Sequence, residues 1–210
     1  MMQHKDVSGV AIGGPVSCDD FERMIRLDTL RLGHRDCGLK RRWFAVAVAS
    51  GREKAVENDL QALGVEALVP LRKIPKRKRG PRVFPEQWVP VIHGYILVCL
   101  PAQVDILAGL LGVKGVRGLV GGFEFPRPLL TEEVNNFKRL AKAGAYDADV
   151  VCGFTLARDE KVRVKAGPFA GMMAVTVTPS TRGKGEVVVL IDLLGAMVPV
   201  TLPLALVEKL

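Results

Sequence analysis

The stretch Lys161-Val-Arg-Val-Lys-Ala-Gly-Pro-Phe-Ala-Gly171 decides the fold of the C-terminal part of this 210-residue chain. Apolar and basic residues alternate in its first half, which is typical of a strand with one buried face. Pro168, with a glycine before it and another after it, predicts a tight turn before a further strand. Because the chain beyond this turn is rich in valine and punctuated by glycine and proline, we expect a small closed β-barrel over residues 156–210.

The last quarter of the chain is expected to form strands rather than helices. The run Glu186-Val-Val-Val-Leu-Ile191 is β-branched, which favours extended structure. Pro199 and Pro203 would each break a helix through the following segment.

Upstream of the barrel, strand patterns alternate with helix patterns. Residues 143–155 carry neither pattern, so we interpret them as a linker between a domain at 41–142 and the barrel. The expected strands cover 43–49, 65–69, 88–100 and 113–120, and the expected helices begin at Ser50, Pro101 and Thr131. Ser50 and Glu53 have the spacing of a capping box, and Thr131 is the expected cap of its helix.

Residues 1–40 form an extension of a different character. An apolar helical face is expected from Phe21, Met24, Ile25 and Leu32, with Ser17 or Asp19 as the N-cap. Since one amphipathic helix cannot bury itself, this helix packs on the main body, meets a partner, or is disordered.

The chain carries a formal net charge of +8, which favours a polyanionic partner such as nucleic acid. The plainer alternative is a soluble protein that happens to be basic. The positive charge is concentrated within residues 71–83, where consecutive cations predict an exposed loop or hairpin tip. The candidate nucleic-acid-binding residues are Lys73, Lys76, Arg77, Lys78, Arg79 and Arg82. No aromatic residue lies among them in the sequence, so we expect phosphate contacts without base readout, or else a merely solvated loop.

The sequence offers no constellation for catalysis or metal binding. The histidines are scattered, there is no phosphate-binding glycine loop, and the cysteines form no CxxC pair. We therefore expect no enzymatic activity, no cofactor and no metal. No apolar run approaches the ~20 residues that a membrane helix needs, and the N-terminus makes a poor signal peptide, so we expect a cytoplasmic protein without membrane contact. We also expect a monomer.

Several short motifs follow one another in an order that resembles the NusG/RfaH family of transcription elongation factors. The resemblance covers about four-fifths of the chain and leaves out residues 1–40. The segment 161–171 resembles the KOW motif of that family. The other matching motifs are Trp43-Phe44, Ser50-Gly51-Arg52-Glu53, Val69-Pro70, Gly94-Tyr95-Ile96-Leu97-Val98, Gly112-Val113, Val120-Gly121-Gly122 and Pro128-Leu129-Leu130-Thr131-Glu132-Glu133-Val134.

The resemblance implies an α+β protein. An N-terminal antiparallel sheet with flanking helices would precede a small all-β, SH3-like KOW barrel. It also implies a transcription elongation or antitermination factor that binds the clamp helices of RNA polymerase, suppresses pausing, and links to other factors through the KOW domain.

The resemblance further implies which residues bind. The polymerase would contact an exposed apolar concavity, and a place in the core is the alternative for Trp43 and Tyr95. The hairpin would lie near upstream DNA. The implied polymerase-binding residues are Trp43, Phe44, Pro70, Phe84 and Tyr95, and the implied KOW partner-binding residues are Phe169, Leu193 and Leu194.

Three positions depart from the family pattern. His93 replaces a proline, Ala174 replaces a glycine, and Leu194 replaces an aromatic residue at the barrel tip. That tip in NusG-like proteins helps to contact termination factor Rho or a ribosomal protein. The departures put those partners in doubt and indicate a specialised paralogue.

A second hypothesis is a ribosome- or RNA-binding KOW protein, because such barrels and such a charge also occur there. It leaves the N-terminal domain unexplained. A small-molecule enzyme is the third hypothesis, and it lacks any site.

Overall fold

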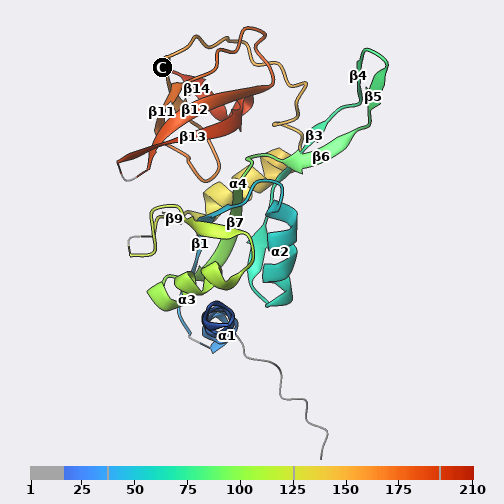
Figure 1. Ribbon diagram of the computed structural model, residues 1–210. Coiled ribbons are helices and arrows are strands. Elements are labelled where there is room, and N and C mark those ends of the chain that lie inside the picture. Colours follow the sequence, from blue (N-terminus) through green and yellow to red (C-terminus); the bar gives the residue numbers. More distant parts are fainter. Residues whose placement is uncertain (1–16, 37, 125, 194) are drawn as a thin grey trace, which may run out of the picture.

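The computed structural model describes residues 17–36, 38–124, 126–193 and 195–210 (Figure 1). An antiparallel sheet forms the centre of the N-terminal part, in the order β2-β7-β1-β8, with β9 paired to one end of β1. The mixed helical and antiparallel architecture confirms the expected α+β class. The strands are β1 (Arg41–Val48), β2 (Glu66–Leu68), β7 (Tyr95–Pro101), β8 (Val116–Leu119) and β9 (Pro128–Leu129).

The two faces of this sheet bury different partners, because side chains alternate along a strand. Phe44 and Val46 of β1 belong to one hydrophobic cluster, together with residues of α2 (Glu53–Ala62), α3 (Val104–Gly109) and the 3-10 turn η1 (Leu110–Gly112). Trp43 and Ala45 belong to the other cluster, which includes residues of α4 (Thr131–Lys142) and of the C-terminal barrel.

Helix α2 begins differently from the expected capping box. Its N-cap is Arg52, which makes no side-chain cap hydrogen bond. Glu53 is buried instead, and its carboxylate accepts a hydrogen bond of 2.7 Å from the N–H of Gly94. Glu57, one turn later, accepts from the N–H of Val69 at 3.0 Å. The two acids therefore tie the helix to neighbouring loops, and this tertiary use overrides the local cap.

Helix α4 (Thr131–Lys142) also begins one residue earlier than expected. Thr131 is its first helical residue and Leu130 is the N-cap, so the prediction that Thr131 caps the helix is wrong. The carboxylate of Glu133 reaches back and accepts from the N–H of Leu130 at 3.4 Å. Phe137 and Ala141 face the core.

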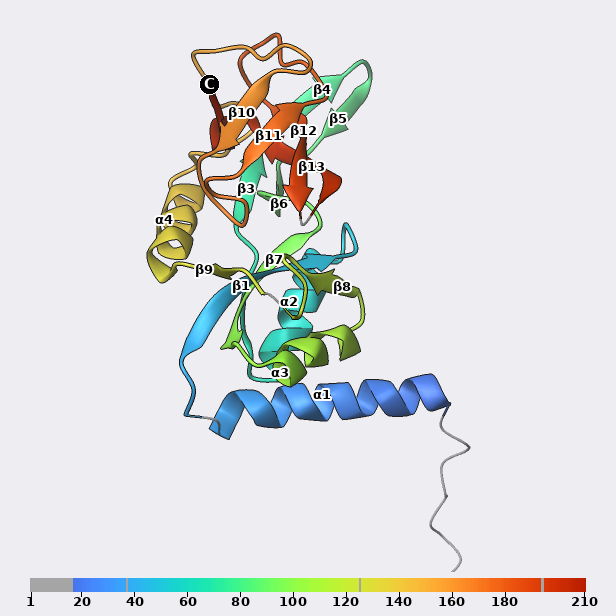
Figure 2. The same cartoon turned by 90° about the vertical axis from the view of Figure 1, so that its left-hand side faces the viewer.

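Helix α1 (Cys18–Asp36) lies across α3 and η1 (Figure 2). Ser17 caps it by accepting a hydrogen bond from the N–H of Asp20 at 3.1 Å, as the sequence predicted. The packed face, however, is the one that carries Leu27 and the fully buried Leu30. The apolar stripe predicted from the sequence lies on the other side of the helix and is exposed, at Phe21, Met24, Ile25 and Leu32.

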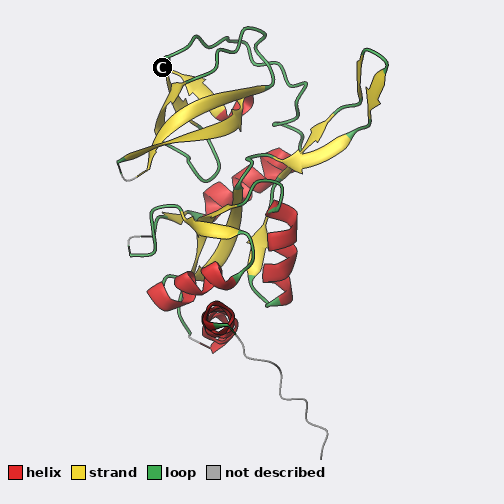
Figure 3. Cartoon of the chain, viewed as in Figure 1, coloured by secondary structure: helices red, strands yellow, loops and turns green. Residues whose placement is uncertain are grey.

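The C-terminal part is a five-stranded antiparallel sheet in the order β13-β12-β11-β10-β14, curled around its own core (Figure 3). The predicted strands at 186–191 and through both prolines are confirmed. The elements are β10 (Lys161–Val164), β11 (Met173–Thr176), β12 (Glu186–Leu193), β13 (Ala196–Pro203), η2 (Leu204–Leu206) and β14 (Val207–Lys209).

The segment 143–155, expected as a linker, is attached at several points. Asp147 accepts a hydrogen bond of 2.7 Å from the N–H of Lys73, and the N–H of Ala148 donates to the Lys73 carbonyl. Val151 forms a bridge with Lys184 of the barrel region. The side chain of Tyr146 is buried against Phe137, with the ring centroids 5.4 Å apart. This segment therefore has defined contacts with both parts of the chain.

A long hairpin leaves the N-terminal part between β2 and β7 and projects away from the sheet (Figure 1). Its base is the pair β3 (Leu71–Ile74) and β6 (Gln87–Pro90), and its outer half is the pair β4 (Arg77–Arg79) and β5 (Arg82–Phe84).

Candidate functional site

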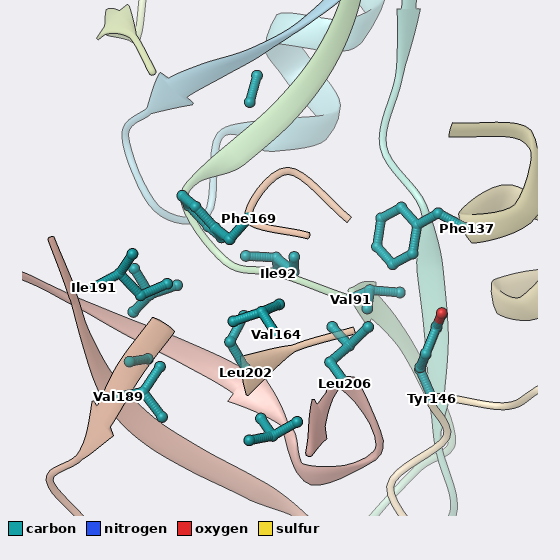
Figure 4. Close-up of a cluster of buried hydrophobic side chains, with 14 of the residues drawn as sticks. Val91, Ile92, Phe137, Tyr146, Val164, Phe169, Val189, Ile191, Leu202 and Leu206 are labelled. Carbon is teal, nitrogen blue, oxygen red and sulfur yellow. The ribbon is translucent and has the colours of Figure 1, made fainter. Parts of the chain in front are cut away.

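The apolar sheet face that carries Trp43 and Tyr95 is covered by the barrel. The ring of Tyr95 packs edge-on against that of Phe169, with centroids 4.9 Å apart and planes at 87°. Gly167, in the turn before Phe169, lies against Ile92 and Phe137. Figure 4 shows side chains of both parts in one cluster. The Gly-Pro-Phe turn of the barrel thus fills a hollow between the sheet and α4.

The five implied polymerase-binding residues do not share one surface. Trp43 is 8% exposed and Tyr95 is half-buried, both on the covered face. Phe44 follows Trp43 directly in β1, so it points to the opposite face and is buried beneath the helices. Pro70 lines a separate groove beside Trp88. Phe84 lies on β5 in the outer half of the hairpin.

An ion pair also joins the two parts. The guanidinium of Arg72 in β3, which is 2% exposed, contacts the carboxylate of Glu186 at the start of β12. Burial lowers the pKa of Arg72, and the charges of Glu186 and Asp147 oppose that shift. His93 lies 3.8 Å from the same carboxylate. The pair places a charged contact at the base of the hairpin, next to the covered apolar face.

The structure brings the predicted basic residues together on the hairpin. Arg77 of β4 lies over the ring of Phe84, 5.6 Å from its centroid, and the backbone of Arg79 pairs with that of Arg82. Lys73 is nearer the base, where its ammonium group is 2.8 Å from the carboxylate of Glu86. The hydrogen bond to Glu86 raises the pKa of Lys73.

Trp88 is the residue of this region that the sequence reasoning missed. It lies on β6 directly opposite Lys73, and 61% of its surface is exposed. No aromatic residue lies among the cations in the sequence, but cross-strand pairing places Trp88 and Phe84 beside them. The alternation of strand residues could have indicated this, but only with the hairpin register known.

The implied partner-binding residues of the barrel differ in accessibility. Phe169 is fully buried in the contact with Tyr95. Leu193 is half-buried at the end of β12, and the N–H of Gly195 donates to the carboxylate of Asp192 at 2.7 Å. Leu194 lies outside the described residues.

Two further observations concern the described part of the chain. Within residues 17–36, 38–124, 126–193 and 195–210, no group of three or more His, Cys, Asp or Glu is placed to hold a metal ion. None of the helices described is both long and apolar enough to cross a membrane.

The fold and the site define a two-part α+β protein, in which a basic hairpin extends from a sheet domain and a small barrel covers the apolar face of that sheet. The family model described as transcription termination factor nusG matches residues 41–138. The chain is therefore similar to NusG over this range, and its C-terminal β-rich part fits a KOW domain.

Curated relatives match over most of the chain. The transcription termination/antitermination protein NusG of Borreliella burgdorferi is 25% identical over 187 residues, which are 82% of this chain and 100% of the relative. The NusG of Staphylococcus carnosus is 28% identical over 190 residues, which are 81% and 96% of the two chains. A solved structure concerning domain interaction in Thermotoga maritima NusG is 24% identical, covers 81% of this chain and 98% of its own, and has a TM-score of 0.40.

Proposed function

We propose that this protein is a transcription elongation and antitermination factor that binds the clamp helices of RNA polymerase. The binding surface is the sheet face of β1 and β7 that carries Trp43 and Tyr95. The observation that supports this proposal is the NusG domain match at 41–138, together with an apolar face of the sheet that is covered in part by the barrel. An amphipathic helical tip laid in an apolar groove is a common recognition mode.

The covered face imposes a condition on this function. Because Phe169 and Gly167 occupy the hollow beside Tyr95, the clamp helices and the barrel compete for one surface. Polymerase binding therefore requires the barrel to move away from this face. The polymerase would shift the equilibrium of the protein from the covered form to the open form. The segment 143–155 is the linker that permits this movement between domains at 41–142 and 156–210.

We propose the remaining roles on the strength of the similarity to NusG. Once bound, the N-terminal domain bridges the polymerase cleft and suppresses pausing by disfavouring the open clamp. The basic hairpin contacts nearby DNA phosphates, which adds affinity that weakens with salt. The barrel, once released, links to other factors through Leu193 and Leu194. NusG-family transcription factors are not enzymes, and we assign this chain no catalytic role or cofactor.

Retention on RNA polymerase after nuclease treatment tests this function. The wild type is compared with Glu186→Arg, which places a second cation against buried Arg72 and weakens the covered form. Glu208→Arg on β14 is the matched control, since it changes charge equally on an exposed barrel residue that pairs with β10. We expect Glu186→Arg to raise retention and the control to leave it unchanged.

Loss of all partners with the nucleic acid, in every variant, would contradict the proposal and favour an RNA- or ribosome-binding KOW protein instead. Retention that is equal for the wild type and Glu186→Arg would contradict the competition between barrel and clamp.

A further inference from the structure

Helix α1 packs on the body of the protein with one face and leaves the opposite face uncovered. The packed face carries Leu27 and the fully buried Leu30. Because an α-helix turns by about 100° per residue, Phe21 lies diametrically opposite Leu30. Figure 2 shows α1 along the end of the molecule away from the barrel. The uncovered stripe consists of Phe21, Met24, Ile25 and Leu32, which are between 51% and 67% exposed.

The stripe has the spacing of a coiled-coil seam. Its central row runs through Phe21, Ile25, Asp28 and Leu32, at intervals of four, three and four residues. These intervals are those of alternating a and d positions in a heptad repeat, and such a seam is completed by another helix. With 19 residues, α1 is about 28 Å long at a rise of ~1.5 Å per residue, which is enough for several interlocking layers of side chains.

We propose that this stripe pairs with the same stripe of a second copy of the chain, with the two α1 helices antiparallel across a two-fold axis. The inference goes beyond the proposed function. The dimer uses α1, which lies on the helix-covered side of the sheet, and leaves the face of Trp43 and Tyr95 to the polymerase. It departs from the monomer expected from the sequence.

The charges along α1 favour a second copy over other partners. The helix carries five acidic residues and four arginines, whereas nucleic acid or an anionic membrane surface would select a basic helix. Asp19, Asp20 and Glu22 lie in its first two turns, and the exposed Arg31 lies beyond its middle. An interface between identical surfaces must be complementary to itself. An antiparallel pair meets this condition, because the acidic end of each helix then faces the later half of the other.

One register satisfies both the apolar and the charged side chains. When Phe21 lies opposite Leu32 of the second copy, Glu22 lies opposite Arg31 of the second copy, and the two-fold axis repeats both pairs. Within its own helix, Glu22 has only an exposed contact of 3.5 Å with Arg26, which stabilises little and can be exchanged. A parallel pair would instead place the acidic ends side by side. The antiparallel arrangement also opposes the two helix dipoles.

Asp28 is the polar position in this seam. In the same register it lies opposite Ile25 of the second copy, where a carboxylate loses hydration without gaining a cation. A single helix pair is also at the small end of specific interfaces. We therefore expect a weak dimer whose affinity is limited by Asp28.

The test is sedimentation velocity of the full chain at about 1–500 µM protein, the range in which a small interface dissociates. We expect Leu32→Glu to weaken the wild-type dimer at least about tenfold, because the lost apolar contact acts once in each copy. Asp28→Leu should tighten it at least about tenfold by completing the seam. Val83→Glu is the matched control, because Val83 is an exposed apolar residue on the hairpin. Circular dichroism checks that every variant keeps its helix content.

A charge exchange tests the register. Glu22→Arg and Arg31→Glu should each weaken the dimer, and the double variant should restore it, because only the double variant again pairs opposite charges across the axis. A wild type that remains monomeric throughout the concentration range would overturn the inference. So would a dimer that Leu32→Glu and Val83→Glu weaken equally, or that Asp28→Leu fails to tighten. Single charge variants that the double variant does not rescue would overturn the antiparallel register.

The outcome is separable from the proposed function, because the measurement uses no polymerase. If the wild type is monomeric while retention on polymerase persists, the dimer inference fails and the polymerase proposal stands. If the dimer responds to the substitutions as expected but polymerase is not retained, the reverse holds.

Discussion

The guanidinium of Arg72 is a charge held where the hairpin, the sheet domain and the barrel meet. It is nearly inaccessible, and two of its nitrogens, Nε and Nη1, lack a hydrogen-bond partner within the described residues. Its contact with Glu186 is therefore its main compensation. A buried charge that loses its partner is costly, whereas replacing it with an apolar side chain of similar volume often is not.

This asymmetry gives the first prediction. Glu186→Gln should lower the free energy of unfolding by roughly 1–3 kcal/mol, a value reduced from that of a fully buried pair because Glu186 is 39% exposed. Arg72→Met should cost less than Glu186→Gln. Urea denaturation of both variants measures the difference. A larger loss for Arg72→Met would mean that the pair, rather than the burial of Arg72, determines the stability of this junction.

Tyr146 gives the second prediction, on pH. Its hydroxyl is buried without a hydrogen-bond partner among the described residues, and burial raises its pKa from 10 to about 12. Because the folded state holds this proton more tightly than the unfolded state, its contribution to stability is present below pH 10 and is lost as pH rises through 12.

Tyr146→Phe should therefore remove part of the alkaline loss of stability and leave neutral stability unchanged or slightly raised, since no hydrogen bond is broken. Thermal unfolding across that pH range measures this effect. An unchanged alkaline slope in the variant would show that Tyr146 does not titrate in this way.

At the scale of elements, helix α1 depends on a close approach to α3. A Cβ atom added to Gly109 would lie 2.8 Å from the carbonyl oxygen of Arg26 and 3.0 Å from the Cβ of Leu30. Contacts with backbone cannot be relieved by a side-chain rotation. Gly109 has an ordinary helical conformation, so any effect of a substitution arises from packing and not from its own backbone angles.

The third prediction is that Gly109→Ala displaces α1, at a cost of about 1–3 kcal/mol. Hydrogen exchange should become faster in α1 while β1 and β7 remain protected. The control is Gly118→Ala, at a position where an added Cβ meets no atom within 4 Å. Equal protection of α1 in both variants would contradict the tight packing.

The fourth prediction concerns the hairpin. Replacing Lys76, Arg77 and Lys78 by Gln should reduce the salt dependence of duplex DNA binding by about 0.9 in log–log slope for each phosphate that is no longer neutralised. The same replacements at Arg158, Lys161 and Arg163, exposed on the barrel, serve as control. A reduction of similar size in the control would mean that the overall charge of the protein, rather than the hairpin, determines DNA binding.

The elements also show what the sequence could predict. Alternation and proline placement were sufficient to predict the strands of the barrel, and the block of consecutive cations was sufficient to predict the exposed hairpin. The prediction of a capping box at Ser50 was wrong because the carboxylate of Glu53 accepts a hydrogen bond from the N–H of Gly94, 41 residues away. The prediction of which face of α1 packs was wrong because Leu27 and Leu30, rather than the predicted apolar stripe, contact α3. Both errors arise where a tertiary contact overrides a local pattern.

At the scale of the whole molecule, the candidate site depends on how two parts meet. Sequence motifs could indicate Trp43 and Tyr95 as candidates. No periodicity in the sequence could predict that the ring centroids of Phe169 and Tyr95 lie 4.9 Å apart. Covering this apolar face removes surface that would otherwise be exposed, which favours the closed arrangement. Under the proposed function, the same cover makes the availability of the face, rather than its composition, the quantity that controls polymerase binding.

The most direct test is a titration of the Glu186→Arg variant with a clamp-helix fragment of RNA polymerase, monitored by NMR through the amide and indole chemical shifts. We predict that the chemical-shift changes cluster on the sheet face that the barrel covers in the wild type, at Trp43, Ala45, Tyr95 and Leu97. We also predict that the fragment binds the wild type more weakly than it binds the variant. Shifts confined to the opposite face at Phe44 and Val46, or to the hairpin alone, would contradict this mechanism.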